Sequence, residues 1–262
     1  EQELGRLQSE VQSLHRAGNY QKALQAAEQL LKSTKSHFGT SHPATAAAYN
    51  NTGLMRKLLG DFEQSRKDYV IARDIYAAAV GNDHASYANI LHNLGNLNRS
   101  QIHLDSSLKA TDRLGLMDAA LEYLETAHSI RKNELGVSHP HTVASRSSWG
   151  ATLATKILNH HKMTETASAA SGDLMRQRFY ISILPTDVTD TAWQAAEEHL
   201  RQALQISLDT PRGKSINNGN DGPQTLSAAA AAQNLVFFLK TRATTTDAAD
   251  TANKHEYFQE AQ

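Results

Sequence analysis

The sequence predicts an all-α solenoid of about five stacked helix pairs, because one segment recurs along the chain at a fixed spacing. His42 and His84 follow similar turn-like sequences and are 42 residues apart. Gly18, in Gly-Asn-Tyr, and Gly60, in Gly-Asp-Phe, have the same separation of 42 residues. Two landmarks that share one spacing indicate supersecondary units that stack on their neighbours. Proteins of this kind mostly bind other molecules along an extended surface.

Each unit is expected to contain two helices, called A and B in chain order. In the second unit the pattern predicts helix A over residues 44–59 and helix B over 61–79. Gly60 falls in the turn between them, where a left-handed residue is favoured. In the first unit helix A is predicted over residues 3–17. A proline costs little at the first position of a helix, and three A helices are expected to start at Pro43, Pro140 and Pro223.

Small residues recur on both helices of each unit, at spacings of three, four and seven that place them on one helix face. This pattern predicts that the A and B helices of a pair approach closely, with larger apolar residues between the small ones. The glycines of the A helices are Gly53, Gly95 and Gly150, and the B helices carry Ala23, Ser65, Ala120 and Ala196.

The A helices resemble the tetratricopeptide repeat family, in the 42-residue variety found in kinesin light chains. The phrase that carries the resemblance is His-Pro-x-Thr-Ala followed by Asn-Asn-Leu-Gly. It stands here at residues 42–46 with 50–53, at 92–95, and at 139–143 with 147–150. The resemblance implies a right-handed α-solenoid over one domain, 1–262. Its expected repeats span about 1–41, 42–83, 84–138, 139–208 and 223–262.

The landmarks move apart after the second unit, which indicates insertions. Insertions in solenoids normally lie in the loops between helices and leave the stack intact. The longest one includes an apolar, β-branched run that favours burial, either on the solenoid or against a neighbouring chain. Its candidate contact residues are Phe179, Tyr180, Ile181, Ile183 and Leu184. The expected insertions span about 101–113, 159–190, 209–222 and 241–253.

The composition of the 262 residues limits which partners and which cellular compartment are expected. The chain has 26 Lys and Arg against 27 Asp and Glu, so it lacks a strong electrostatic drive toward nucleic acid, which we expect to be contacted indirectly if at all. It has no cysteine and no apolar stretch near the roughly 20 residues of a membrane helix. We expect an intracellular protein, cytoplasmic or mitochondrial. Its start at Glu1 and its end in a helical pattern at Gln262 favour a part of a longer chain.

The motifs that carry catalysis or bind metals are not recognisable in the sequence. Thirteen histidines occur, but none lies in a helix at i, i+4 with a supporting Glu. Residues 213–215 imitate the end of a phosphate loop without the earlier glycine. No Gly-x-Ser-x-Gly occurs. We therefore expect no catalytic residue, no metal and no cofactor, and a protein that is not an enzyme.

The resemblance implies that the A helices line a concave groove, in which an Asn before the Leu-Gly pair can bind the backbone of an extended peptide. An amide offers both a donor and an acceptor, which suits this role. The alternative is that these amides cap or bridge neighbouring helices within the stack. The candidate groove residues are Asn50, Asn51, Leu54, Lys57, Asn93, Asn96 and Arg99, with Asn234 a weaker match.

Two functional hypotheses remain open at this point. The first is a non-enzymatic adaptor or scaffold that binds a protein or peptide segment in the groove. The second is a structural subunit of a large assembly, such as an organellar ribonucleoprotein, whose insertions contact its neighbours. The Asn51 and Asn93 pair favours the first hypothesis, and the growing insertions favour the second.

Overall fold

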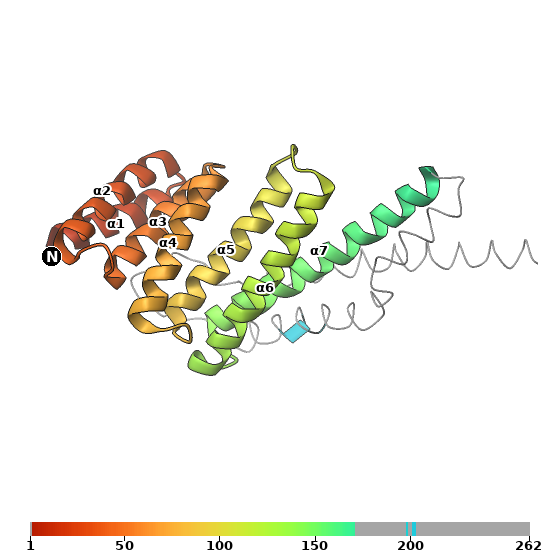
Figure 1. The fold of residues 1–262 in the computed structure, drawn as a ribbon. Helices are drawn as coiled ribbons and strands as arrows, with labels where there is room; N and C mark the ends of the chain where they lie inside the picture. Colours follow the sequence, from red (N-terminus) through yellow and green to blue (C-terminus); the bar gives the residue numbers. More distant parts are fainter. Residues whose placement is uncertain (1, 171–197, 199–200, 203–262) are drawn as a thin grey trace, which may run out of the picture. The chain divides into compact units, whose positions relative to one another are not determined.

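The computed structural model describes residues 2–170, 198, 201 and 202, and within this part of the chain it contains helices and no strand (Figure 1). The helices are α1 (Gln2–Arg16), α2 (Tyr20–Phe38), α3 (Pro43–Leu58), α4 (Phe62–Val80), α5 (Ala85–Leu104), α6 (Ala110–Leu135) and α7 (Pro140–Ala170). The A helices are α1, α3, α5 and α7, and the B helices are α2, α4 and α6.

The chain divides into two compact units. One comprises Glu1–Ser145 with Pro211–Thr225, and the other Arg146–Thr210 with Leu226–Gln262. The helices α1 to α6 and the first turns of α7 lie in the first unit. Repeat five, Asn234, the run from Phe179 to Leu184 and the insertions expected at 209–222 and 241–253 lie outside the described residues.

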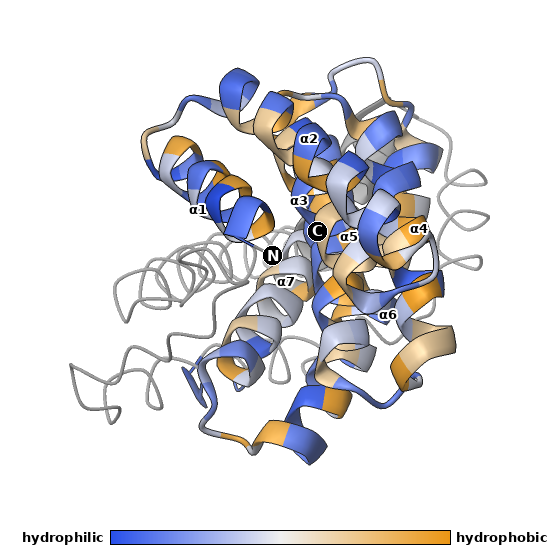
Figure 2. Cartoon of the chain, turned by 90° about the vertical axis from the view of Figure 1, so that its left-hand side faces the viewer, coloured by the Kyte–Doolittle hydropathy of each residue, from blue (hydrophilic) through white to orange (hydrophobic). Residues whose placement is uncertain are grey.

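Within the first unit each helix packs against the next one along the chain, and α3 also contacts α5. Pairs of helices that contact mainly their sequence neighbours form a solenoid. Each of these helices carries both hydrophilic and hydrophobic residues, as Figure 2 shows, so one stripe of each is available for burial. The prediction of an all-α solenoid of helix-turn-helix repeats is confirmed.

The predicted helix ends are correct to within two residues in the first two units. The third helix begins at Pro43, and α3 and α4 are joined through Gly60. Gly60 has a φ of +84°, and Gly18 has a φ of +73° at the equivalent turn between α1 and α2. Side chains rarely adopt this left-handed conformation, which explains why glycine recurs at both turns.

The close approach of A and B helices occurs where the glycines predict it. A Cβ atom on Gly53 would lie 2.9 Å from the Tyr69 ring of α4. A Cβ atom on Gly95 would lie 2.7 Å from Cγ of Leu124 on α6. Neither position has room for a methyl group. Gly150 is buried on α7, and its close contact stays a prediction.

The core of the first unit lies along these contacts. Tyr69 and Leu124, which lie between small residues of the B helices, are completely buried. The small residues of the B helices are completely buried as well, which lets the larger side chains interlock. These small residues are Ala23, Ser65, Ala72, Ala120 and Ala127.

The insertion expected as a loop at 101–113 instead lengthens both helices of the third pair. The α5 helix continues to Leu104, and α6 already begins at Ala110. Arg113 stabilises the short connection, because its guanidinium donates to the carbonyl oxygens of Ile102 at 2.5 Å and Asp105 at 2.8 Å. These carbonyl groups lie at the end of α5, where the last carbonyl groups of a helix have no N–H donor within the helix.

The expectation of a loop from residue 159 is also wrong over its first part. The α7 helix continues through Ala170, so residues 159–170 are helical. Nothing in residues 159–170 breaks a helix, since they contain neither proline nor glycine. The rest of that insertion lies outside the described residues.

Candidate partner-binding surface

Three basic side chains occupy the same position in successive A helices. His15, Lys57 and Arg99 are separated by 42 residues each, which is the period of the repeat. They lie near the C-terminal ends of α1, α3 and α5. We call these three residues the cationic row. Stacked repeats place equivalent positions next to one another, so the row runs across the A helices.

The pKa values of the row indicate that its members share a poorly solvated surface. Burial lowers the pKa of Lys57 from 10.5 to about 8, and the nearby Arg99 guanidinium lowers it further. Burial, followed by the charge of Lys57, lowers the pKa of His15. Burial also lowers the pKa of Arg99. Each shift disfavours the charged form, as expected for like charges held close together away from water.

No carboxylate neutralises the row within the described part of the chain. The Arg99 guanidinium donates to the Asn96 side-chain oxygen at 3.2 Å, a neutral partner. The Lys57 ammonium forms no ion pair there. Half-buried cations without a counter-ion are unfavourable, because they lose part of their hydration. An anionic group from another molecule would offset this desolvation cost.

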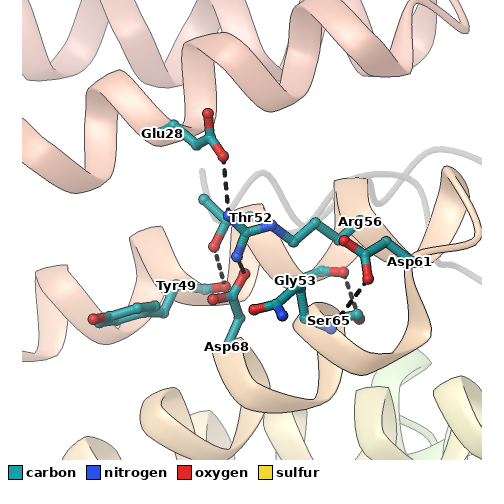
Figure 3. Close-up of polar contacts among 9 residues, drawn as sticks. Glu28, Tyr49, Thr52, Gly53, Arg56, Asp61, Ser65 and Asp68 are labelled. Atoms are coloured by element: carbon teal, nitrogen blue, oxygen red, sulfur yellow. Dashed lines mark hydrogen bonds and ion pairs between the residues drawn. The ribbon is translucent and has the colours of Figure 1, made fainter.

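The adjacent Arg56 has the opposite environment, as Figure 3 shows. Its guanidinium lies 2.9 Å from a Glu28 oxygen on α2 and 2.5 Å from an Asp68 oxygen on α4. Asp68 is buried, and burial raises the pKa of its carboxyl group, an effect that the Thr52 hydroxyl and the Arg56 charge partly offset. Arg56 therefore joins neighbouring repeats, and Lys57 is left available.

Asn93, one of the candidate groove residues, is buried within the stack. Asn93 is only 6% exposed, and its side-chain nitrogen donates to the Asn50 side-chain oxygen at 2.7 Å. The two residues lie on α5 and α3, so the bond joins successive repeats. For this pair the structure favours the alternative in which the amides bridge helices within the stack.

Asn51 differs from Asn93, because it is half-buried and lines a pocket of about 350 Å³. The pocket lies between α1, α2 and α3, and its apolar wall includes Leu4, Leu30 and Phe38. In the region that the structure resolves in detail, the Asn51 amide has no hydrogen-bond partner. It therefore remains a candidate for contact with a peptide backbone. Leu54, one turn further on, is half-buried.

Asn96 belongs to a polar network that the sequence did not reveal. Its side-chain nitrogen lies 2.8 Å from Nε2 of His92, and Nδ1 of His92 lies 3.3 Å from the Ser145 hydroxyl. Arg131 donates to that hydroxyl at 2.5 Å. Burial, followed by the charges of Arg131, Lys57 and Arg99, holds the pKa of His92 well below its usual range. His92 is therefore neutral at physiological pH.

A serine beside a histidine is the arrangement of many acyl-transfer sites. Ser145 is completely buried, however, and its hydroxyl already accepts a hydrogen bond from Arg131. A substrate carbonyl would not reach it. The network serves to join α5, α6 and the start of α7.

Among the described residues, no group of three His, Cys, Asp or Glu residues could hold a metal ion. None of the described helices is long and apolar enough to cross a membrane.

The fold defines a class of protein, an α-helical solenoid of stacked helix pairs. Family models for the tetratricopeptide repeat match residues 11–69 and 109–141. These two stretches are therefore tetratricopeptide repeats, and the fold is of the kinesin-light-chain-like variety, as the resemblance implied.

Solved structures agree with this assignment at the level of the fold. The kinesin light chain nearly identical TPR-like repeats from Podosopora anserina are 16% identical, with a TM-score of 0.57 over 98% of this chain and 94% of that one. BtubC (BKLC) from P. vanneervenii is 21% identical, with a TM-score of 0.52 over 81% of this chain and 68% of that one. No curated protein matches the sequence at a significant level.

Proposed function

We propose that the chain is a protein-interaction adaptor whose A-helix surface binds an acidic segment of a partner protein. The observation that supports this proposal is the cationic row, in which Lys57 and Arg99 are half-buried and lack a carboxylate partner among the described residues. Interaction with protein partners is the general role of tetratricopeptide repeats, and the acidic character of the segment is specific to this chain.

The geometry of the repeat limits the spacing of the acidic residues. Neighbouring packed helices lie about 8–10 Å apart. An extended peptide advances about 3.3 Å per residue. Carboxylates two or three positions apart in such a peptide would therefore match Lys57 and Arg99. We propose that the Asn51 amide, about two helical turns before Lys57 on α3, contacts the peptide backbone nearby.

The proposal is tested by peptide selection, which requires no known partner. A random peptide library is displayed and selected on the full chain and on the double variant Lys57→Met, Arg99→Met. Methionine keeps much of the apolar stem and removes the charge. The matched control is Lys67→Met, which removes an exposed lysine that pairs with Glu63 on α4.

We expect peptides with carboxylates two or three residues apart to be enriched on the full chain and on the Lys67 variant. Their binding should weaken by at least tenfold in the double variant and should fall with rising salt. Equal binding to the double variant, or equal binding of a peptide with glutamine in place of each acidic residue, would contradict the proposal.

A second candidate function is the structural subunit, and the lengthened third helix pair favours it. Leu104 is 71% exposed at the end of α5. A separate shallow pocket of about 560 Å³ lies against α4, α5 and α6, with Phe62, Leu108 and Leu116 on its wall. Exposed apolar surface of this kind often marks a protein contact.

Affinity purification followed by mass spectrometry distinguishes the two functions. A stable large assembly that is lost on deletion of residues 175–184, or on Leu104→Ser, would support the subunit. The same experiment would show whether the assembly is a ribonucleoprotein and whether it is mitochondrial or cytoplasmic. Loss of partners only on changing Lys57 and Arg99 would support the adaptor.

A further inference from the structure

The side chain of Lys57 on α3 lies among basic groups rather than beside a carboxylate. It is half-buried, and the Arg99 guanidinium on α5 is close enough to repel its charge. The Lys57 charge acts in turn on His15 of α1 and on the buried His92 of α5. Within the described residues no carboxylate forms an ion pair with Lys57. Its surroundings therefore disfavour the ammonium form and favour the neutral amine.

A neutral amine has a chemistry that an ordinary surface lysine lacks, because only the unprotonated nitrogen carries a lone pair and acts as a nucleophile. At about pH 7.5, a lysine with a pKa of about 8 is neutral roughly a quarter of the time, against about one part in a thousand at the ordinary pKa of 10.5. The half-buried position favours a small electrophile over a bulky acyl donor.

The neighbouring Arg99 would stabilise a negative charge on a substituent of the Lys57 nitrogen. A guanidinium presents its N–H donors in a planar fork that matches the two oxygens of a carboxylate. In the described part of the chain, Arg99 donates through Nη1 to the neutral Asn96 oxygen at 3.2 Å. Its other N–H groups have no acceptor there. A carboxylate attached to Lys57 would therefore convert a contact between like charges into an ion pair.

We propose that Lys57 is a carbamate site, at which the side-chain amine binds carbon dioxide covalently and reversibly and Arg99 holds the carboxylate that forms. The lone pair on Nζ attacks the carbon atom of carbon dioxide, and an N–C bond forms. The electron pair of one C=O bond moves to its oxygen, and the proton released from Nζ passes to water. Nothing is oxidised or reduced, and the reverse step returns the amine and carbon dioxide.

The carbamate would change the sign of the charge in the middle of the cationic row. Lys57 lies between His15 and Arg99 in the order of the stacked helices α1, α3 and α5. With a carboxylate at this position, the row would bind an acidic segment more weakly. This consequence rests on the proposed function, whereas the carbamate itself does not depend on what the row binds.

The test measures the adduct on the full chain without any partner, so its outcome is independent of the proposed function. The protein is incubated near neutral pH with carbon-13-labelled bicarbonate, which supplies carbon dioxide, and the carbamate carbon is observed by NMR. A free α-amino group also reacts, because its pKa is near neutrality. The adducts are therefore trapped by alkylation with an oxonium salt and located by mass spectrometry.

The reference lysine is Lys67 of the same chain, which is exposed and paired with Glu63. We expect the trapped carbamate on Lys57 to exceed that on Lys67 by at least tenfold, since far more of its amine is neutral. Lys57→Arg keeps the positive charge but has no primary amine, so only the signal of the α-amino group should remain.

The role of Arg99 is tested by Arg99→Met, which should lower the amount of trapped carbamate on Lys57 severalfold. The matched control is Arg66→Met, because Arg66 is also half-buried and donates to the neutral oxygens of Asn98 and Gln101. This control should leave the Lys57 adduct unchanged. Equal adducts on Lys57 and Lys67, or an adduct confined to the α-amino group, would overturn the proposal. An adduct that Arg99→Met does not reduce would overturn it as well. If Arg99→Met does not fold, the ratio of the Lys57 and Lys67 adducts in the original chain still decides.

Discussion

The side-chain amide of Asn93 donates a 2.7 Å hydrogen bond to the side-chain oxygen of Asn50, across the contact between α5 and α3. Two residues from successive repeats are thereby joined through groups that the motif alone suggests for binding a peptide. The bond is short and Asn93 is buried, so it contributes to the stack itself.

Replacing Asn93 with Ala should lower the free energy of unfolding by about 1–3 kcal/mol, because the half-buried Asn50 oxygen loses its donor. Urea denaturation would measure this change. The matched control is Asn51→Ala on the half-buried side of α3, which should change stability by no more than about 0.5 kcal/mol. Equal losses in the two variants would contradict the bridging role of Asn93.

Gly95 should tolerate no side chain, because an added Cβ atom would lie 2.7 Å from Cγ of Leu124. We expect Gly95→Leu to lower the free energy of unfolding by about 1–3 kcal/mol, and Gly95→Ala to act in the same direction. The control is Gly115→Ala in α6, which has nothing within 4 Å of the added atom and should gain about 0.5–1 kcal/mol. Thermal unfolding of Gly95→Ala and Gly115→Ala shows whether the first variant is less stable and the second more stable than the original chain. A stabilising Gly95→Ala would exclude the close contact.

Arg56 should stabilise the stack more than an ordinary surface arginine does. Its loss in Arg56→Met leaves the Asp68 carboxylate buried without its cation, so we expect a cost of about 2 kcal/mol or more. The control is Arg6→Met, which removes an exposed i, i+4 pair with Glu10 and should cost about 0.5 kcal/mol or less. Chemical denaturation of the two variants measures both changes. Similar costs would show that the Arg56 contacts contribute little.

The fold could be predicted because its determinants are local and repeat along the chain. Gly60 and Pro43 mark a turn and a helix start through their own backbone preferences. The pairing of Gly95 with Leu124 follows from one small and one large residue at fixed positions of a pair. The period of 42 residues then placed each unit beside the next.

The details of the surface could not be predicted, because they depend on partners from distant parts of the chain. The motif marks Asn93 but does not specify whether its amide meets Asn50 or a ligand. In the sequence, Lys57 and Arg99 are similar to ordinary solvated charges on a helix. Their relation becomes apparent only because His15 lies at the same 42-residue spacing. The wider spacing of the landmarks suggested a loop at residues 101–113, since spacing does not reveal that Arg113 binds the carbonyl groups at the end of α5.

The pH dependence of stability above neutrality should depend on Lys57. Its pKa is about 8 in the folded chain and about 10.5 when unfolded. Between these values the unfolded chain binds more protons, so the free energy of unfolding should rise with pH from about 8 upward. Burial raises the pKa of Tyr69, which has the opposite effect above pH 10, so the window for measurement is about pH 7.5–9.5.

Lys57→Met should remove this rise and increase stability at pH 7, because it removes a poorly solvated charge that Arg99 repels. Urea unfolding at several pH values within the window would measure the slope. Lys67→Met, which removes an exposed lysine paired with Glu63, should keep the slope of the original chain. An acidic peptide bound to the cationic row should abolish the rise as well, since its carboxylate would favour the charged form of Lys57. A slope that is unchanged by Lys57→Met would show that Lys57 is well solvated and would remove the main support for the acidic partner.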